Sequence, residues 1–223
     1  MPAFFGRRVG DRVVIEGGDA RHLARSLRAR RGEVIEVVDP EGFLLNVLLD
    51  SVTAERVEGS VASERLHHPE PPAQITIAVA NLPAAALELV LSRCTEAGAY
   101  AFVVFQADRS VAQGEKLERC ATICREAAML AARLRVPEVS VASSLDAVIG
   151  AEEYPVMLVR DAPRRLADLS EPRDLTLVVG PEGGWTDREL ALAEVTATLG
   201  PRNLRADTAT VVGLAVALAA RYG

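Results

Sequence analysis

The stretch Leu175-Thr176-Leu177-Val178-Val179-Gly180-Pro181-Glu182-Gly183-Gly184 is an apolar run followed directly by a glycine turn. The run 175–179 predicts a buried strand, because it is short, β-rich and bounded by turn residues. Thr186 and Glu189 have the spacing of a capping box, which predicts that a helix begins there and continues to about residue 199. Strand, glycine turn and helix in this order are typical of the ligand crevices of open α/β sheets, since glycine lets the backbone approach a ligand closely.

A second glycine turn follows that expected helix, in the segment Leu199-Gly200-Pro201-Arg202-Asn203-Leu204-Arg205-Ala206-Asp207-Thr208-Ala209. Gly200 and Pro201 are expected to end the helix, by a left-handed stop and by blocking its continuation. Asp207 or Thr208 is expected to cap a final helix over 209–221. This helix is apolar on nearly every side, so it is predicted to be buried.

Together the two turns predict a site for a nucleoside ligand. Neither a Gly-x-x-x-x-Gly-Lys-Ser/Thr loop nor a Gly-x-Gly-x-x-Gly loop occurs in the chain, and Glu182 in the first turn would repel a pyrophosphate. A nucleoside with a positive charge, such as S-adenosylmethionine, would tolerate this carboxylate while exposed main-chain groups read its adenine. For either turn alone, an ordinary strand-to-helix connection is the alternative.

At these turns the chain resembles the bacterial small-subunit ribosomal RNA uridine-N3 methyltransferases of the knotted SPOUT class. The family's Gly-Pro-Glu-Gly-Gly turn is intact at 180–184. Its Leu-Gly-x-Arg-x-Leu-Arg-x-Glu-Thr-Ala segment is present at 199–209, with Asp207 in place of glutamate and Asn203 in place of an aliphatic residue. Weaker similarities run through most of the chain in the same order: His22-Leu23, Leu27-Arg28, Thr95-Glu96, Arg109-Ser110, Glu126-Ala127-Ala128 and Arg133-x-Arg135-Val136-Pro137.

The resemblance implies an α/β fold with a trefoil-knotted SPOUT methyltransferase domain over 73–223 and an N-terminal PUA-like, RNA-binding β-barrel domain over 1–68. It implies transfer of a methyl group from S-adenosylmethionine to N3 of a uridine in 16S ribosomal RNA. In this family the cofactor pocket lies against a two-fold partner, so the apolar last helix predicts a homodimer. The implied cofactor contacts are Gly180, Pro181, Glu182, Gly183, Gly184, Leu199, Gly200, Leu204, Arg205 and Thr208.

The chain departs from the family where positive charge for RNA is usual. Pro83 and Ala86 stand in place of two lysines, and Arg93 replaces a third. These departures leave open a catalytically weakened RNA-binding or ribosome-assembly factor of the same fold, or a methyltransferase of the class with a different RNA target. A nucleotide-dependent α/β enzyme unrelated to RNA is a further alternative, but it would need phosphate-cradling turns that the chain lacks.

Positive charge is concentrated at the N-terminus, although the formal net charge of the chain is -6. Residues 1–31 carry eight arginines and three acidic residues, and a helix is expected from Asp19 as N-cap to Gly32. Phosphate contacts from such arginines would position RNA without reading its sequence, whereas a solvated helix face is the alternative. The expected RNA contacts are Arg7, Arg8, Arg21, Arg25, Arg28 and, from the second domain, Arg93.

Candidate catalytic residues are arginines, because the three histidines, at 22, 67 and 68, all precede the expected catalytic domain. Methylation of uridine N3 requires that nitrogen to become anionic, and an arginine could stabilise the charge that develops on the uracil. Arg205 is the first candidate, followed by Arg133 and Arg109 from matched family positions. A structural ion pair is the alternative role of each.

The composition predicts a globular cytoplasmic protein, since the N-terminus lacks an apolar signal segment and no apolar stretch is long enough to span a bilayer. The odd number of cysteines, Cys94, Cys120 and Cys124, indicates a reducing compartment. Cys120 and Cys124 share a helical face, but no further Cys or His completes a tetrahedral site, so no metal is expected.

Short strands are expected in the first domain, at 13–16, 34–39, 43–52 and 56–63. The proline-rich stretch 66–72 is expected to be a linker. Beyond it, strands and helices alternate, which predicts a parallel α/β sheet. The expected elements are strands at 75–80, 101–105 and 156–159, a helix ending at Glu96 and a long helix over about 115–135.

Overall fold

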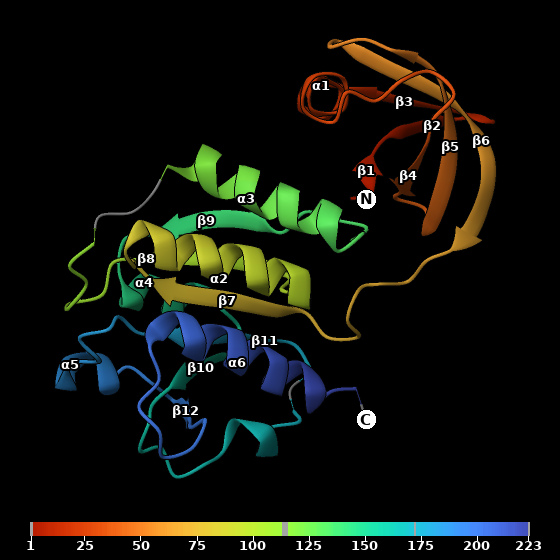
Figure 1. The fold of residues 1–223 in the computed structure, drawn as a ribbon. Coiled ribbons are helices and arrows are strands. Elements are labelled where there is room, and N and C mark those ends of the chain that lie inside the picture. The colour runs from red at the N-terminus through yellow and green to blue at the C-terminus, as the bar shows by residue number, and fades with distance from the viewer. Residues whose placement is uncertain (1, 113–115, 172, 223) are drawn as a thin grey trace. The chain divides into compact units, whose positions relative to one another are not determined.

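The chain folds into two compact units in a computed structural model, which describes residues 2–112, 116–171 and 173–222 (Figure 1). The N-terminal unit comprises residues 1–70 together with 128–136, and the sheet unit comprises 71–127 and 137–223. The boundary at Glu70 lies within the expected linker. Residues 128–136 pack in the N-terminal unit, where the Ala3 amide donates to the Met129 carbonyl oxygen at 2.9 Å.

A six-stranded sheet forms the N-terminal unit, and all four strands expected there are present. Strand β1 pairs with β4 in parallel, and the other neighbours are antiparallel, in the order β1-β4-β5-β6-β3-β2. Irregular register between β5 and β6 bends the sheet. Its strands are β1 (Phe4–Phe5), β2 (Arg7–Val9), β3 (Arg12–Glu16), β4 (Val34–Asp39), β5 (Phe43–Val52) and β6 (Arg56–Leu66).

The basic helix expected over 19–32 is much shorter than predicted. Helix α1 covers Gly17–Arg21 and continues as a π-helical turn, η1, over His22–Ser26. Asp19 lies inside α1 rather than capping it, and Arg28 adopts a left-handed backbone with φ 55°. Ala20 and Leu23 are fully buried in the core of the unit. Because Arg28 lies beyond the helical turns, the single regular arginine stripe expected there is wrong.

Six parallel strands form the sheet of the second unit, which confirms the predicted parallel α/β architecture. The order is β12-β10-β11-β7-β8-β9. Strands β8 and β9 therefore lie on one side of β7, and the later strands β10, β11 and β12 lie on its other side. The strands are β7 (Ile75–Ala80), β8 (Ala101–Phe105), β9 (Glu138–Ala142), β10 (Pro155–Leu158), β11 (Leu175–Val179) and β12 (Val195–Ala197).

Helices α2 and α6 pack against each other beside this sheet (Figure 1). Gly98, with φ 108°, ends α2 in the left-handed region. Helix α3 stops at Leu130, before the expected end near residue 135, and Ala132 then turns left-handed with φ 50°. The helices are α2 (Ala84–Ala97), α3 (Leu117–Leu130), α4 (Leu145–Ala151), the 3-10 turn η2 (Leu166–Asp168), α5 (Asp187–Leu190) and α6 (Ala206–Ala219).

The helix expected over 186–199 is wrong beyond its first turn. The capping box is present, because the Thr186 hydroxyl accepts from the Glu189 amide and the Glu189 carboxylate accepts from the Thr186 amide. Helix α5 nevertheless ends at Leu190, and residues 195–197 become an edge strand that pairs in parallel with β10. Parallel pairing between segments far apart in sequence outweighs the local helical pattern here.

The last helix, α6, begins at Ala206 with Arg205 as N-cap, three residues before its expected start. The expected caps, Asp207 and Thr208, lie inside it. Burial within the single chain is confined to one side of the helix, because Val212 on its outer side is 40% exposed. The buried positions form one stripe: Ala206, Thr210, Gly213, Leu214, Ala217 and Leu218.

Candidate functional site

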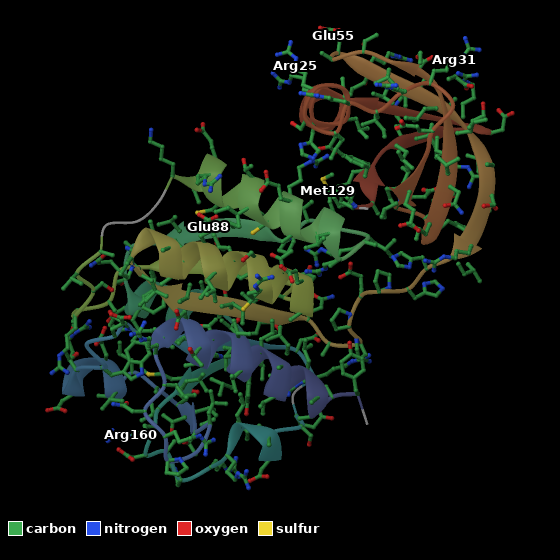
Figure 2. All side chains as sticks on the ribbon, viewed as in Figure 1. Arg25, Arg31, Glu55, Glu88, Met129 and Arg160 are labelled. Carbon is green, nitrogen blue, oxygen red and sulfur yellow. The ribbon has the colours of Figure 1, made fainter. Side chains whose placement is uncertain are left out.

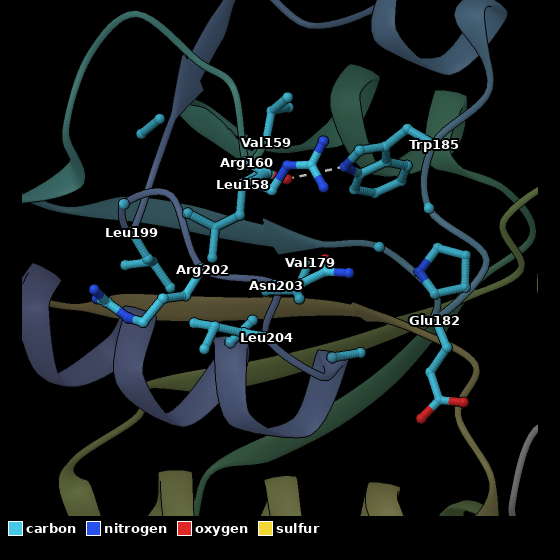
Figure 3. A pocket seen from close by; sticks show the side chains of 17 residues that line it. Leu158, Val159, Arg160, Val179, Glu182, Trp185, Leu199, Arg202, Asn203 and Leu204 are labelled. Carbon is cyan, nitrogen blue, oxygen red and sulfur yellow. Dashed lines mark hydrogen bonds between the residues drawn. The ribbon is translucent and has the colours of Figure 1, made fainter.

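A pocket lies at the carboxyl ends of three neighbouring strands, β10, β11 and β12 (Figure 3). Its wall is formed by residues 158–160 at the end of β10, by 179–182, 184 and 185 at the end of β11, and by 197, 199, 200, 202–204 and 206 at and beyond the end of β12, together with Ala209 of α6. The cavity has a volume of about 190 Å³. The two glycine turns therefore meet in one crevice, at the sheet edge where open α/β folds bind ligands.

The first turn, residues 180–184, is shaped by the tryptophan that follows it. A side chain at Gly180 would bring a Cβ atom to 2.7 Å from the Trp185 ring, so only glycine fits under this ring. The Trp185 indole N–H donates to the Leu158 carbonyl oxygen at 2.9 Å, and its ring stacks on Phe105 with the ring centroids 6.4 Å apart. Gly184 has φ 71°, a conformation that favours glycine.

The second turn is held by the side chain of Thr198. Its hydroxyl donates to the Arg160 carbonyl oxygen at 2.6 Å and accepts from the Gly200 amide at 3.0 Å. Gly200 has φ 102°. The turn thereby presents Leu199 and Leu204 to the pocket, opposite Leu158 of the β10 end (Figure 3).

Two side chains from the segment after β8 fasten the first turn. The Arg109 guanidinium donates through Nη1 to the carbonyl oxygens of Gly183 at 3.2 Å and of Trp185 at 3.1 Å. The Asp108 carboxylate accepts from Arg188 Nη2 at 2.9 Å and from the Thr186 hydroxyl at 2.8 Å. These two hydrogen bonds lower the pKa of Asp108 below its usual value, so the carboxylate is charged at neutral pH.

Most of the residues predicted to contact the cofactor line this pocket. Gly183 does not, because it faces Arg109. Arg205 and Thr208 are absent from the lining, and both are exposed at the start of α6. The lining also contains residues that were not predicted from the sequence, notably Arg160 and Trp185. The place of Trp185 directly after the glycine turn could have indicated that it contributes to the pocket. The predicted residues in the lining are Gly180, Pro181, Glu182, Gly184, Leu199, Gly200 and Leu204.

The three arginines predicted to be catalytic have different surroundings. Arg205 is exposed as the N-cap of α6. Arg109 fastens the first turn from outside the pocket lining. Arg133 belongs to the N-terminal unit, is 3% exposed and forms an ion pair with Glu70 at 2.5 Å, which also accepts from the Leu134 amide at 3.0 Å. These contacts favour a structural role for Arg133.

The arginines predicted to bind RNA are exposed or half-buried, and two of them, Arg8 and Arg93, are paired with acids. Arg7 and Arg8 line a hollow of about 700 Å³ in the N-terminal unit, where Arg8 lies 2.7 Å from Glu64 and 3.6 Å from Asp39. On α2, Arg93 pairs with Glu96 at 2.7 Å. The remaining three, Arg21, Arg25 and Arg28, are exposed; Figure 2 labels Arg25 at the surface of its unit.

No helix among the described residues is long and apolar enough to cross a membrane. Within the same part of the chain, no three His, Cys, Asp or Glu side chains gather as a group able to hold a metal ion. All three cysteines are buried, and burial raises the pKa of the Cys94 thiol to about 12.

Comparison with known proteins relates the chain to RNA methyltransferases. Residues 69–218 match the model of the RNA methyltransferase domain. The chain is 32% identical over 221 residues to ribosomal RNA small subunit methyltransferase E of Synechocystis sp., an alignment that covers 91% of this chain and 71% of that protein. It is 30% identical to the Bacillus subtilis protein of the same name, with 90% and 87% covered.

Solved structures agree with the fold. The ribosomal RNA small subunit methyltransferase E of Neisseria gonorrhoeae, bound to S-adenosylmethionine, matches with a TM-score of 0.88 at 24% identity, covering 99% of this chain and 98% of that one. A Thermotoga maritima protein described as a predicted RNA methyltransferase matches with a TM-score of 0.75 at 25% identity and 98% of both chains. With the family model matched over most of the sheet unit, this chain belongs to the RNA methyltransferase family.

Proposed function

We propose that this chain transfers a methyl group from S-adenosylmethionine to N3 of a uridine in the 16S ribosomal RNA of the small subunit. Its curated relatives are small-subunit ribosomal RNA methyltransferases, and structures of this fold from Neisseria gonorrhoeae and Legionella pneumophila contain S-adenosylmethionine. The observation that carries the proposal is the meeting of both glycine turns in one pocket at the carboxyl ends of β10, β11 and β12.

The pocket residues fit this cofactor. Leucines from two sides, Leu158 at the end of β10 and Leu199 and Leu204 of the second turn, offer apolar surface to an adenine ring. Gly180 and Gly184 bring backbone without a side chain to the pocket wall, so a ligand can approach the main chain closely there. The exposed Glu182 carboxylate attracts the positive charge of a sulfonium. S-adenosylmethionine, when bound, supplies the electrophilic methyl group.

Arginines at the second turn are the proposed catalytic groups. Arg205 is exposed at the N-cap of α6, and Arg202 lines the pocket two residues after Gly200. A guanidinium here stabilises the negative charge that develops on the uracil as N3 loses its proton. Arg205 remains the first candidate. Arg133 is not part of this proposal, because its burial and its ion pair with Glu70 are sufficiently explained by a structural role.

The N-terminal unit is the proposed RNA-binding domain, PUA-like in this family. Exposed arginines of α1 and η1, Arg21 and Arg25, together with Arg28, would contact phosphates and so position the RNA. Glu64 and Asp39 partly neutralise Arg8, so Arg7 is expected to contribute more to RNA affinity. Phosphate contacts of this kind weaken steeply as salt rises.

A homodimer completes the proposed enzyme. The outer side of α6 is apolar and exposed at Val212, Ala215 and Ala219, while residues at its start line the pocket. The cavity of about 190 Å³ is smaller than the roughly 300–1,000 Å³ of most ligand pockets. A second copy covering α6 would bury the apolar side and enlarge the site. The trefoil knot and the cytoplasmic location belong to the same proposal.

The test is methyl transfer to small ribosomal subunits from a strain that lacks the modification. We expect N3-methyluridine in digests of the 16S RNA, detected by mass spectrometry. Gly180→Ala should abolish transfer, because its Cβ would lie 2.7 Å from the Trp185 ring, whereas Gly150→Ala, which meets nothing within 4 Å, should leave it intact. Intact subunits that bind the protein and gain no methyl group would instead support an RNA-binding assembly factor, the alternative favoured by Pro83 and Ala86.

A further inference from the structure

We propose that Arg109 is a positioning residue: it sets the shape of the first glycine turn and so the affinity for the cofactor, without contacting the reacting groups. The inference rests on the proposed cofactor site. It departs from the catalytic role that the family resemblance suggests for Arg109.

The contacts of Arg109 place it behind the turn. Its Nη1 donates to the carbonyl oxygens of Gly183 and Trp185, at 3.2 and 3.1 Å. A Cβ atom at Gly183 would lie 3.0 Å from the Arg109 Cβ, so the arginine stem runs against that glycine. Gly184 and Trp185 line the pocket, while Gly183 and Arg109 do not. The arginine therefore holds the turn from the side away from the ligand.

The segment that carries Arg109 is itself firmly held. The Asp108 amide donates to Glu189 Oε1 at 2.9 Å, and Glu189 is fully buried. The Asp108 carboxylate is bound by Arg188 and Thr186, and Arg188 also reaches Asp146 at 3.0 Å. Hydrogen bonds and ion pairs thus join the β8 end to the residues around α5. A rigid support of this kind is what a positioning side chain requires.

Loss of this arginine would loosen the turn. Two glycines in succession, Gly183 and Gly184, give the backbone many alternative conformations, and the charged hydrogen bonds to two carbonyl oxygens select one of them. When only a fraction of molecules has the binding-competent turn, the apparent Kd rises by the inverse of that fraction. The turnover of enzyme saturated with cofactor does not change, because the bound cofactor selects the same conformation. A catalytic arginine would give the opposite pattern.

The experiment compares Arg109→Met, which keeps the length of the side chain and removes its donors, with Arg109→Lys, which restores a donor. Arg119→Met is the matched control, since Arg119 is an exposed arginine of α3 that pairs with Glu88. We expect Arg109→Met to raise the Kd for S-adenosylmethionine about tenfold by calorimetry, with the lysine variant in between and the control unchanged. At saturating cofactor, kcat on small subunits should stay within about threefold of the wild type.

Trp185 supplies an independent measurement, because it is the single tryptophan of the chain and one of the two carbonyls bound by Arg109 is its own. Its emission in cofactor-free Arg109→Met should shift to longer wavelength, and added cofactor should reverse the shift. A loss that falls mainly on kcat would overturn the proposal, as would an unchanged Kd or an unchanged emission. A wild-type protein that binds cofactor but methylates no subunit would refute the proposed function, while the Kd and emission comparisons would still decide the role of Arg109.

Discussion

Removing Glu70 from its ion pair with Arg133 is predicted to lower the stability of the fold more than removing Arg133. In Glu70→Leu, the Arg133 guanidinium, only 3% exposed, loses its carboxylate, and the Leu134 amide loses its acceptor. In Arg133→Met, the remaining Glu70 side chain is 25% exposed and keeps contact with water. The variant that removes the carboxylate beside the more buried charge should therefore be the less stable one.

The magnitudes follow from these exposures. Breaking a buried pair by removing one partner costs about 3–5 kcal/mol, and Glu70→Leu should lie in this range because the guanidinium that loses this carboxylate is almost fully buried. Arg133→Met should cost only about 1–2 kcal/mol, since the carboxylate left behind can be hydrated. Urea unfolding followed by far-UV circular dichroism measures both. Equal costs, or a greater cost for Arg133→Met, would refute the reasoning.

Methyl transfer by the same variants separates structure from catalysis. At a temperature where Arg133→Met is folded, its kcat should stay within about threefold of the wild type, because its partner is a structural carboxylate rather than a substrate. If kcat of the fully folded variant fell a hundredfold or more, which corresponds to about 2.7 kcal/mol of transition-state stabilisation, Arg133 would be a catalytic residue after all.

Three further predictions follow from the sheet unit. Val212→Asp on the exposed side of α6 should convert the proposed dimer into monomers in analytical ultracentrifugation, because it would bury a charge in an apolar contact. Val9→Asp, the same change at an exposed valine of β2 in the N-terminal unit, is the control, and a wild-type monomer at micromolar concentration would contradict the dimer. Because its pKa is depressed in the folded protein, the Asp108 carboxylate stabilises the fold fully above the ordinary carboxyl pKa of about 4, and this contribution is lost as the pH falls through the lower folded value. Asp108→Asn should therefore lower the free energy of unfolding at pH 7 and reduce its fall on acidification, both measured by unfolding followed through Trp185 emission. If the free energy of unfolding of the variant falls with pH in parallel with that of the wild type, this prediction is wrong. Cys94, whose thiol pKa is raised to about 12 by burial, should react with a disulfide reagent at pH 8 only after unfolding, and labelling as fast as in urea would show an accessible thiol.

Local patterns predicted much of the fold. The bounds of five strands, at 34–39, 43–52, 75–80, 101–105 and 175–179, are those expected from short apolar runs between turn residues. The capping box at Thr186 is also local, because its partners are three residues apart. Strand β12 could not be predicted in this way, since its three residues are extended only because β10 lies beside them. The same holds for residues 128–136, which pack into a unit nearly sixty residues earlier in the chain.

In the candidate site too, features set by neighbouring residues could be predicted from the sequence, whereas contacts between distant residues could not. The first glycine turn was predicted from glycine at a strand end; the second was predicted at the end of a helix, whereas in the structure it follows strand β12. The contact between Arg109 and the first turn joins residues 74 positions apart and leaves no trace in local spacing. The resemblance to a family identified Arg109 and Arg133 as candidate catalytic residues, but it did not distinguish a residue that contacts the reacting groups from one that holds the structure of the site. The trefoil knot and the target nucleotide stay predictions.

The excursion of residues 128–136 into the N-terminal unit has a consequence for biosynthesis. The first seventy residues leave the ribosome long before Met129, whose carbonyl oxygen bonds the Ala3 amide and whose side chain joins the core of that unit. The nascent N-terminal sheet must therefore wait, with part of its apolar surface uncovered, until translation has passed residue 136. A fragment ending at residue 70 should therefore precipitate where the whole chain does not.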